Sequence, residues 1–215
     1  TCGVFSVALN NNTIGSVGVP LVYNNIGVFN SETNEELKNG EIGEFYISGK
    51  SMMKQYHNND SENMRTHVNI NGIEWFKTGD VGTISQEKGE LFIQGRIKRI
   101  FVCGVDKVYQ EVMEELICTI PYVQKCVVVA IPDEKLRNVP KVHIILKEQY
   151  RNKKIEKLVT YEIEKIVSEK ISKNVVPHYY EFQEEFAYTP NGKVDFKKIQ
   201  NEDIKKMSIE HQKKK

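Results

Sequence analysis

The stretch "GELFIQGRIKRI", residues 89–100, separates two parts of the chain that differ in sequence pattern. Before it, short runs of aromatic and β-branched residues alternate with Gly, Asn, Lys and Asp turns, a pattern typical of β-strands. The predicted strands lie within residues 14–30, 40–49, 74–84 and 89–96. This spacing predicts a small barrel or sandwich. One helix is expected near residues 60–67, with Asp60 or Ser61 as its N-cap.

After Arg96 the pattern predicts alternating strands and helices. The run "EVMEELICTI", residues 111–120, has apolar residues four apart and predicts an amphipathic helix that Pro121 stops. A longer helix at residues 153–171 is expected to bury one apolar face. That face would consist of Ile155, Leu158, Val159, Ile166 and Ile171. Strands are expected at 125–133, 140–148 and 178–184, and a turn at 189–195 precedes a final helix.

We therefore predict an α+β fold with a boundary at residues 95–99. Residues 1–95 form a β-rich, barrel-like part, and residues 96–200 form a compact α+β domain. The lysine-rich residues 201–215 are predicted to be a basic tail that frays into solvent.

The composition points to no particular class of partner. The chain has 215 residues, 40% of them apolar, with 30 basic and 29 acidic residues, so no net field favours nucleic acid or an anionic membrane. No apolar run approaches 18 residues, so no membrane span is expected. The four cysteines form no Cys-x-x-Cys pair, which argues against zinc and against a disulfide framework and favours a reducing, cytosolic setting.

Three short motifs are candidates for chemistry, although each has an ordinary structural explanation. Thr78-Gly79-Asp80 is predicted to end a strand, where a simple turn would use the same residues. Gly95-Arg96 is a common pair. Asn191-Gly192-Lys193 is also a strong signal for an ordinary hairpin. Their order along one chain is more specific than any one of them.

Taken together, these motifs resemble the C-terminal part of the adenylate-forming (AMP-binding) superfamily of acyl-CoA synthetases, peptide synthetase adenylation domains and luciferases. The segments that match are "GEIGEFYISGKSMMKQYHNN", "WFKTGDVG", "GRIKRI" and "TPNGKVDF". The resemblance implies that residues 1–95 are the β-rich end of a large AMP-binding domain and that residues 96–200 are a mobile C-terminal domain. The family's phosphate loop, adenine-binding residues and acyl pocket would lie upstream.

The resemblance also implies roles for individual residues. Asp80 would bind the ribose of ATP, because a carboxylate can accept hydrogen bonds from two vicinal hydroxyls. Arg96 would bring a planar donor group to the same ribose region. Lys193 would be the catalytic lysine that stabilises the charge developing during adenylation.

Two further positions follow from the hinge motif. Lys98 corresponds to the family's hinge residue, about which the small domain turns between half-reactions, although a solvated linker lysine would look the same. Gly104 is a possible backbone element of the thiol tunnel. The chain is one residue shorter than the family pattern between Lys98 and Lys107, which weakens the assignment of Gly104.

The implied function is that of an acid–thiol ligase of the AMP-forming class. A carboxylic acid would be activated as acyl-AMP by ATP with Mg²⁺, whose ligands lie upstream, and passed to coenzyme A or a carrier-protein phosphopantetheine. This fragment alone would be inactive. The alternatives are part of a peptide synthetase adenylation domain and a non-catalytic nucleotide-binding module. A nucleic-acid module is disfavoured because the basic residues lack interleaved aromatic residues.

Overall fold

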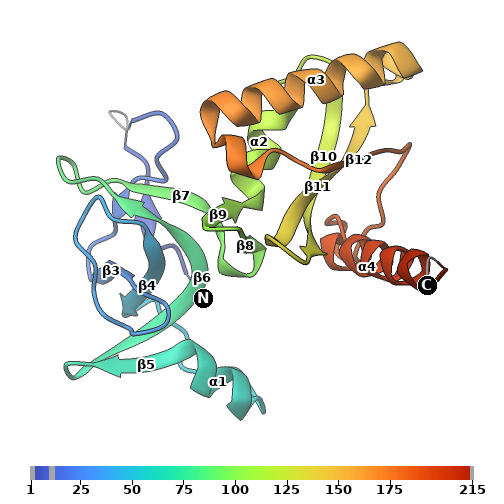
Figure 1. Cartoon of the computed structure of the whole chain (residues 1–215). Helices are drawn as coiled ribbons and strands as arrows, with labels where there is room; N and C mark the ends of the chain where they lie inside the picture. Colours follow the sequence, from blue (N-terminus) through green and yellow to red (C-terminus); the bar gives the residue numbers. More distant parts are fainter. Residues whose placement is uncertain (1–2, 10–12, 214–215) are drawn as a thin grey trace. The chain divides into compact units, whose positions relative to one another are not determined.

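The structure is a computed structural model that describes residues 3–9 and 13–213 (Figure 1). The chain divides into two compact units, residues 1–98 and residues 99–215. Cys2 and the last two residues of the predicted tail lie outside the described residues. Among the described helices, none combines the length and the apolar content that a membrane span needs.

A curled five-stranded antiparallel sheet forms the first unit, in the order β3–β4–β6–β5 with β7 also paired to β6. Its strands are β3 (Asn24–Phe29), β4 (Gly43–Gly49), β5 (His67–Ile70), β6 (Ile73–Ile84) and β7 (Leu91–Arg96). A separate two-stranded sheet pairs β1 (Ser6–Val7) with β2 (Val19–Pro20). The strands predicted at residues 74–84 and 89–96 are present as β6 and β7.

The helix predicted near residues 60–67 is α1 (Asp60–Thr66), but its N-cap is Asn59 rather than Asp60 or Ser61. The Asn59 side-chain oxygen accepts a hydrogen bond from the backbone N–H of Glu62 at 3.2 Å. Asn is as good an N-cap as Asp or Ser, so residue type could not choose among the three neighbours.

The first unit has small, separate groups of buried apolar side chains. In one, Phe29 stacks on Tyr46 with ring centroids 4.4 Å apart and meets the edge of Trp75 at 5.0 Å. A second contains Phe45 and three aliphatic residues, and a third contains Phe76 with two others. Phe45 and Phe76 flank the part of β6 that carries Thr78-Gly79-Asp80.

A second five-stranded sheet forms the centre of the other unit, in the order β10–β11–β8–β9. These strands are antiparallel, and a fifth strand pairs with β11 in parallel. The strands are β8 (Ile100–Cys103), β9 (Asp106–Tyr109), β10 (Val123–Asp133), β11 (Arg137–Leu146) and β12 (Tyr179–Phe182). One continuous cluster of buried apolar residues joins this sheet to its helices.

Helices α2 (Gln110–Cys118) and α3 (Lys153–Lys170) form where the periodicity predicted them (Figure 1). The buried stripe of α3 differs from the prediction in part, because it consists of Val159, Ile163 and Val167. Leu158 and Ile171, which were predicted to lie on that face, are each 37% exposed. A strict four-residue spacing keeps one stripe against the core, whereas the predicted set combined two neighbouring stripes.

Helix α4 (Phe196–Lys213) extends through most of the segment that was predicted to be a frayed tail. Asp203, inside that segment, is only 2% exposed. Its carboxylate pairs with Lys141 and His143 on β11, and these contacts hold this part of the helix on the sheet. The described residues also contain three short 3₁₀ helices, at Ile97–Arg99, Glu148–Tyr150 and Lys173–Val175.

Candidate functional site

Thr78-Gly79-Asp80 lies inside strand β6 rather than at its end, which corrects the prediction. On the neighbouring strand β4, Glu44 pairs with Val81 and Tyr46 pairs with Lys77. The three residues Thr78, Gly79 and Asp80 therefore face the single residue Phe45. This register of three residues against one is a β-bulge, and bulges re-aim side chains next to functional sites.

Side-chain hydrogen bonds fix the geometry of the bulge. The Thr78 hydroxyl donates to the carbonyl oxygen of Phe45 at 2.8 Å and accepts from the backbone N–H of Asp80 at 3.0 Å. Gly79 has a φ of 75°, in the left-handed region that glycine adopts without strain. The bulged backbone of β6 at Thr78 and Asp80 is thus fixed by hydrogen bonds of the Thr78 hydroxyl.

Glu44 is a site residue that the sequence did not reveal. Its carboxylate accepts a hydrogen bond from the backbone N–H of Gly79 at 2.9 Å, and the residue is only 6% exposed. Burial raises the pKa of the Glu44 carboxyl, while the Gly79 N–H and nearby Lys77 oppose that rise. The only signal in the sequence was an acidic residue inside a strongly apolar strand, which implies a buried partner.

Asp80 and Arg96 meet across strands β6 and β7. They are directly opposite in the strand register, and the Arg96 Nε lies 3.0 Å from the Asp80 Oδ1. The Asp80 side chain is 28% exposed and the Arg96 side chain 66%. A carboxylate acceptor and a guanidinium donor are therefore adjacent and reachable, which suits a ligand that carries hydroxyl groups.

Two hollows in the first unit adjoin this pair. A cavity of about 390 Å³ is lined by Glu44, Gly79 and Lys98 among others, and one of about 340 Å³ is lined by Asp80 among others. Both are at the lower end of the size range of small-molecule sites. The residues that line both hollows are Tyr56, Phe76, Thr78 and Arg96.

Lys98 lies at the division between the two units. It is exposed, it belongs to the 3₁₀ turn Ile97–Arg99, and the first unit ends with it. Among the ion pairs of the described residues, none involves Lys98, whereas two involve the next residue, Arg99.

That neighbour, Arg99, is fixed inside the second unit. Its guanidinium forms two hydrogen bonds with the Glu114 carboxylate, at 3.0 and 2.5 Å, and a third with the Gln110 side chain at 3.2 Å. The side chains of Arg99 and Glu114 are 13% and 15% exposed. The guanidinium also lies over the ring of Phe196, at 4.7 Å from its centroid. Arg99 therefore connects α2 to the start of α4.

Gly104 lies in a two-residue hairpin turn between β8 and β9, which the sequence analysis did not predict. Cys103 and Asp106 are the last paired residues, and Gly104 has a φ of 63°, as such turns require at their first position. Its backbone N–H donates to the carbonyl of Leu136 at 2.8 Å. The one-residue shortening in the sequence coincides with this tight turn.

Lys193 lies on a short, hydrogen-bonded turn of the second unit, and it is exposed. The Thr189 N–H donates to the Lys193 carbonyl at 2.7 Å, and the Lys193 N–H donates to the Thr189 hydroxyl at 3.2 Å. Two residues later, the Asp195 carboxylate caps α4 by accepting from the Lys198 N–H at 3.0 Å. The position of Lys193 is therefore tied to the beginning of α4.

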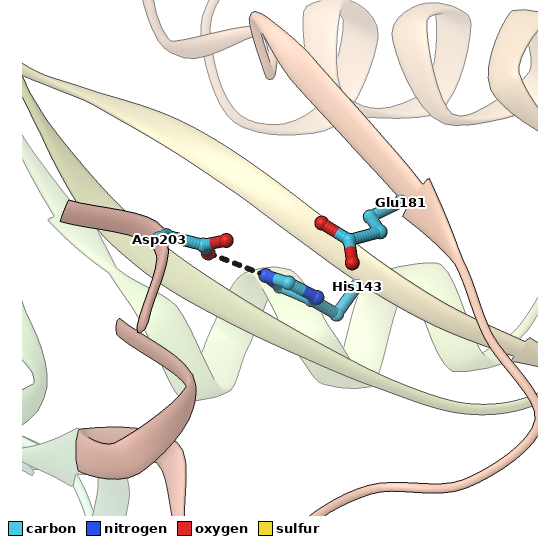
Figure 2. A group of neighbouring side chains, drawn as sticks. All are labelled: His143, Glu181 and Asp203. Atoms are coloured by element: carbon cyan, nitrogen blue, oxygen red, sulfur yellow. Dashed lines mark hydrogen bonds and ion pairs between the residues drawn. The ribbon is translucent and has the colours of Figure 1, made fainter. Parts of the chain in front are cut away.

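His143, Glu181 and Asp203 converge from β11, β12 and α4 (Figure 2), with ligand-type atoms within 4.8 Å of one another. His143 Nε2 lies 2.6 Å from Asp203 Oδ2. The Lys141 ammonium lies 2.6 Å from Asp203 and 2.7 Å from Glu181, so these carboxylates already share a cation whose side chain is mostly covered. A metal ion here would be repelled by that ammonium, and the cluster is best described as the anchor of α4.

The structure thus brings together Asp80 and Arg96, with Lys98 beside the same cavity as Arg96. Gly104 and Lys193 belong to the second unit. Sequence reasoning missed Glu44, and it named Thr78 within its motif without foreseeing that the Thr78 hydroxyl positions Asp80. It also missed the pair of Arg99 and Glu114, which follows the unit boundary.

Comparison with known proteins identifies relatives of this chain in sequence and in structure. Residues 112–193 match the model of the AMP-binding enzyme C-terminal domain. The chain is 29% identical over 198 residues to a long-chain-fatty-acid–CoA ligase of Bacillus subtilis, covering 92% of this chain and 33% of the ligase. It is also 29% identical over 188 residues to the mitochondrial medium-chain acyl-CoA ligase ACSF2 of Mus musculus, covering 87% of this chain and 29% of that ligase.

The fold agrees with these matches. The crystal structure of ATP-bound MatB from Rhodopseudomonas palustris superposes with a TM-score of 0.75 at 22% identity, over 88% of this chain and 36% of that chain. The chain spans about a third of the length of these relatives. Residues 112–193 belong to the family of AMP-binding enzyme C-terminal domains, and nearly the whole chain is similar in sequence to the C-terminal third of acyl-CoA ligases.

Proposed function

We propose that this chain is the C-terminal part of an ATP-dependent, AMP-forming acid–thiol ligase. The complete enzyme activates a carboxylic acid as an acyl-adenylate and transfers the acyl group to the thiol of coenzyme A. The observation that carries this proposal is the β-bulge that presents Asp80 beside Arg96. The relatives support the ligase class, since those compared above are named as CoA ligases.

Asp80 is the ribose-binding residue in this proposal. Its two carboxylate oxygens accept hydrogen bonds from the two vicinal hydroxyls of the ribose, and Arg96 donates to the same sugar. The bulge matters because Thr78 and Glu44 hold the backbone on both sides of Gly79, so Asp80 needs no rearrangement of its backbone to bind. Preorganisation of this kind lowers the entropic cost of binding.

Lys193 supplies positive charge during adenylation. When the substrate carboxylate attacks the α-phosphate, negative charge develops on the phosphate and on the departing pyrophosphate, and an ammonium at that point stabilises the transition state. Mg²⁺ would contribute charge neutralisation with ATP, and its ligands are expected ahead of residue 1. The thiol acceptor would approach along a tunnel whose backbone includes Gly104.

Lys98 is the hinge. Two features support this role: the first unit ends at Lys98, and the next residue, Arg99, is held in the second unit by Glu114 and Gln110. A pivot needs one free backbone position beside a fixed one, because hinge residues absorb the φ/ψ change of a domain motion.

The cytosolic setting inferred from the cysteine pattern stays a prediction.

The test separates the two half-reactions in the full-length enzyme. Lys193→Ala is expected to lower pyrophosphate exchange, which reports adenylation, by about a hundredfold because a preorganised charge is lost from the transition state. Thioester formation from a supplied acyl-adenylate should survive. The control is Lys197→Ala, which removes another exposed lysine four residues away, on α4. Equal loss of both half-reactions in Lys193→Ala would refute the assigned role.

A further inference from the structure

Two cysteines of the second unit are almost in contact. Cys118 is the last residue of α2, Cys126 lies on β10, and their sulfur atoms are 3.6 Å apart. Both are free thiols in this structure. A disulfide has an S–S distance of about 2.0 Å, so the sulfurs need to approach by only ~1.6 Å.

The two thiols differ in environment in a way that assigns them different roles. Cys118 is exposed, whereas Cys126 is 9% exposed and also lies 3.4 Å from the carbonyl oxygen of Glu114. An external oxidant can therefore reach Cys118 first. Cys126 is placed behind it, where it can attack the sulfur of Cys118 from within the protein.

The hydrogen bond between the thiols also favours Cys118 as the nucleophile. Because the Cys126 S–H can donate to the Cys118 sulfur, the pKa of Cys118 falls to about 7, although burial and the carboxylates of Glu114 and Glu115 oppose the change. The same hydrogen bond, together with burial, raises the pKa of Cys126. A thiol that is exposed, partly ionised and adjacent to a second thiol is the arrangement found at redox-sensitive cysteines.

We propose that Cys118 and Cys126 are a modification site that forms a reversible intramolecular disulfide. With a small-molecule disulfide as oxidant, the Cys118 thiolate attacks one sulfur and forms a mixed disulfide, and a small thiolate leaves. The Cys126 thiol then loses its proton and attacks the Cys118 sulfur, and the second small thiolate leaves. The protein loses two hydrogen atoms, and the oxidant is reduced to two thiols.

The bond would link the end of α2 to β10 within the second unit. Disulfide formation would remove the Cys126 S–H, which can donate a hydrogen bond to the backbone carbonyl oxygen of Glu114. The side chain of the same Glu114 binds Arg99. This site lies outside the residues proposed for catalysis, so its chemistry can be tested whether or not the proposed ligase activity is correct.

The experiment uses the intact chain and oxidised glutathione as the probe. After incubation, free thiols are alkylated and the protein is digested with trypsin, which places each of the four cysteines on a separate peptide because Lys107 and Lys125 lie between them. The expected product is a linked pair of the peptides 108–125 and 126–135, which dithiothreitol separates. Cys103, which is buried, serves as the internal control and should remain alkylatable only after unfolding.

Two further measurements assign the order of attack. Alkylation of Cys118 by iodoacetamide should rise with pH around a midpoint near 7, and at neutral pH it should be at least about tenfold faster than alkylation of Cys103. Cys126→Ser should trap the mixed disulfide on Cys118, whereas Cys118→Ser should leave Cys126 unmodified.

If Cys118 and Cys126 stay unlinked in the wild-type chain under these conditions, or if Cys118 links only to a second molecule, the proposal is wrong. The wild-type result does not depend on the folding of either variant.

Discussion

Two arginines, Arg96 and Arg99, are three residues apart in the sequence but differ in how far their side chains are exposed to solvent. Arg96 ends strand β7 with its side chain 66% exposed, and it contacts the partly exposed Asp80. Arg99 begins the second unit with its side chain 13% exposed, and it is held by the carboxylate of Glu114 and the side chain of Gln110. Both are Arg–carboxylate pairs, but only the first is open to solvent, where a ligand could reach it.

The difference shows that the same chemical pair serves two purposes according to its burial. An exposed pair contributes about 0–1 kcal/mol to stability, so its residues are available for binding at little cost to the fold. Removal of one partner from a buried pair leaves an uncompensated charge, which costs about 3–5 kcal/mol. The first pair is suited to function, and the second fixes the structure that follows the proposed hinge.

The largest expected effect comes from Glu114→Ala. Because it leaves the Arg99 guanidinium, which is only 13% exposed, without its hydrogen-bonded carboxylate and also removes the acceptor for the Val128 N–H, the free energy of unfolding of the second unit should fall by about 3–5 kcal/mol. Urea unfolding followed by circular dichroism measures this. The matched control is Glu111→Ala, since Glu111 lies 3.7 Å from the same arginine but is 33% exposed; its loss should cost at most about 1 kcal/mol. Similar losses for both variants would contradict the comparison.

The next effect is on ligand binding rather than stability. In the full-length enzyme, Asp80→Ala should weaken ATP binding by roughly a hundredfold, about 3 kcal/mol, because a charged acceptor for two hydroxyls is lost. The free energy of unfolding should change by less than about 1 kcal/mol. Isothermal calorimetry measures the affinity, with Glu74→Ala, an exposed acid on the same strand, as the control. An ATP affinity within threefold of wild type would exclude the ribose assignment.

The smallest effects come from exchanging the two arginines for lysine. Arg96→Lys keeps the charge at an exposed site and should leave the unfolding free energy unchanged within about 0.5 kcal/mol. Arg99→Lys loses the planar donor group that serves Glu114 and Gln110 together and should cost about 1–2 kcal/mol. Parallel urea titrations of the two variants give the difference. A larger loss for Arg96→Lys than for Arg99→Lys would reverse the assignment of the two pairs.

Much of the fold could be predicted because the relevant signals are local. The alternation in β6 and β7 and the four-residue spacing in α2 are visible within single segments, and each of these elements formed close to its predicted position. The β8–β9 hairpin was missed because its strands are four residues long and its turn, Gly104-Val105, has none of the usual Asn-Gly or Asp-Gly signals. Short elements offer too few residues for a period to be recognised.

Only those residues of the candidate site that belong to a short sequence motif could be predicted. Asp80 and Arg96 were identified from their motifs and lie together, but their roles stay predictions. Glu44, 35 residues before Gly79, and Asp203, 60 residues after His143, act through contacts between distant segments. Strand register and helix docking decide such contacts, and neither has a sequence pattern of its own. The same reason explains why the predicted tail continues as helix α4.

The turn that carries Lys193 has a consequence for timing in the proposed enzyme. Thr189 closes the turn, Asp195 joins it to α4, and Asp203 fixes α4 on the sheet, so the backbone of Lys193 has little freedom of its own. Isolated loops move in nanoseconds to microseconds, whereas domain rotations take microseconds to milliseconds. The catalytic ammonium would therefore reach the substrate on the timescale of the domain rotation rather than on that of an isolated loop. A substitution that loosens Asp203 could then change the rate of adenylation without touching any atom of the substrate.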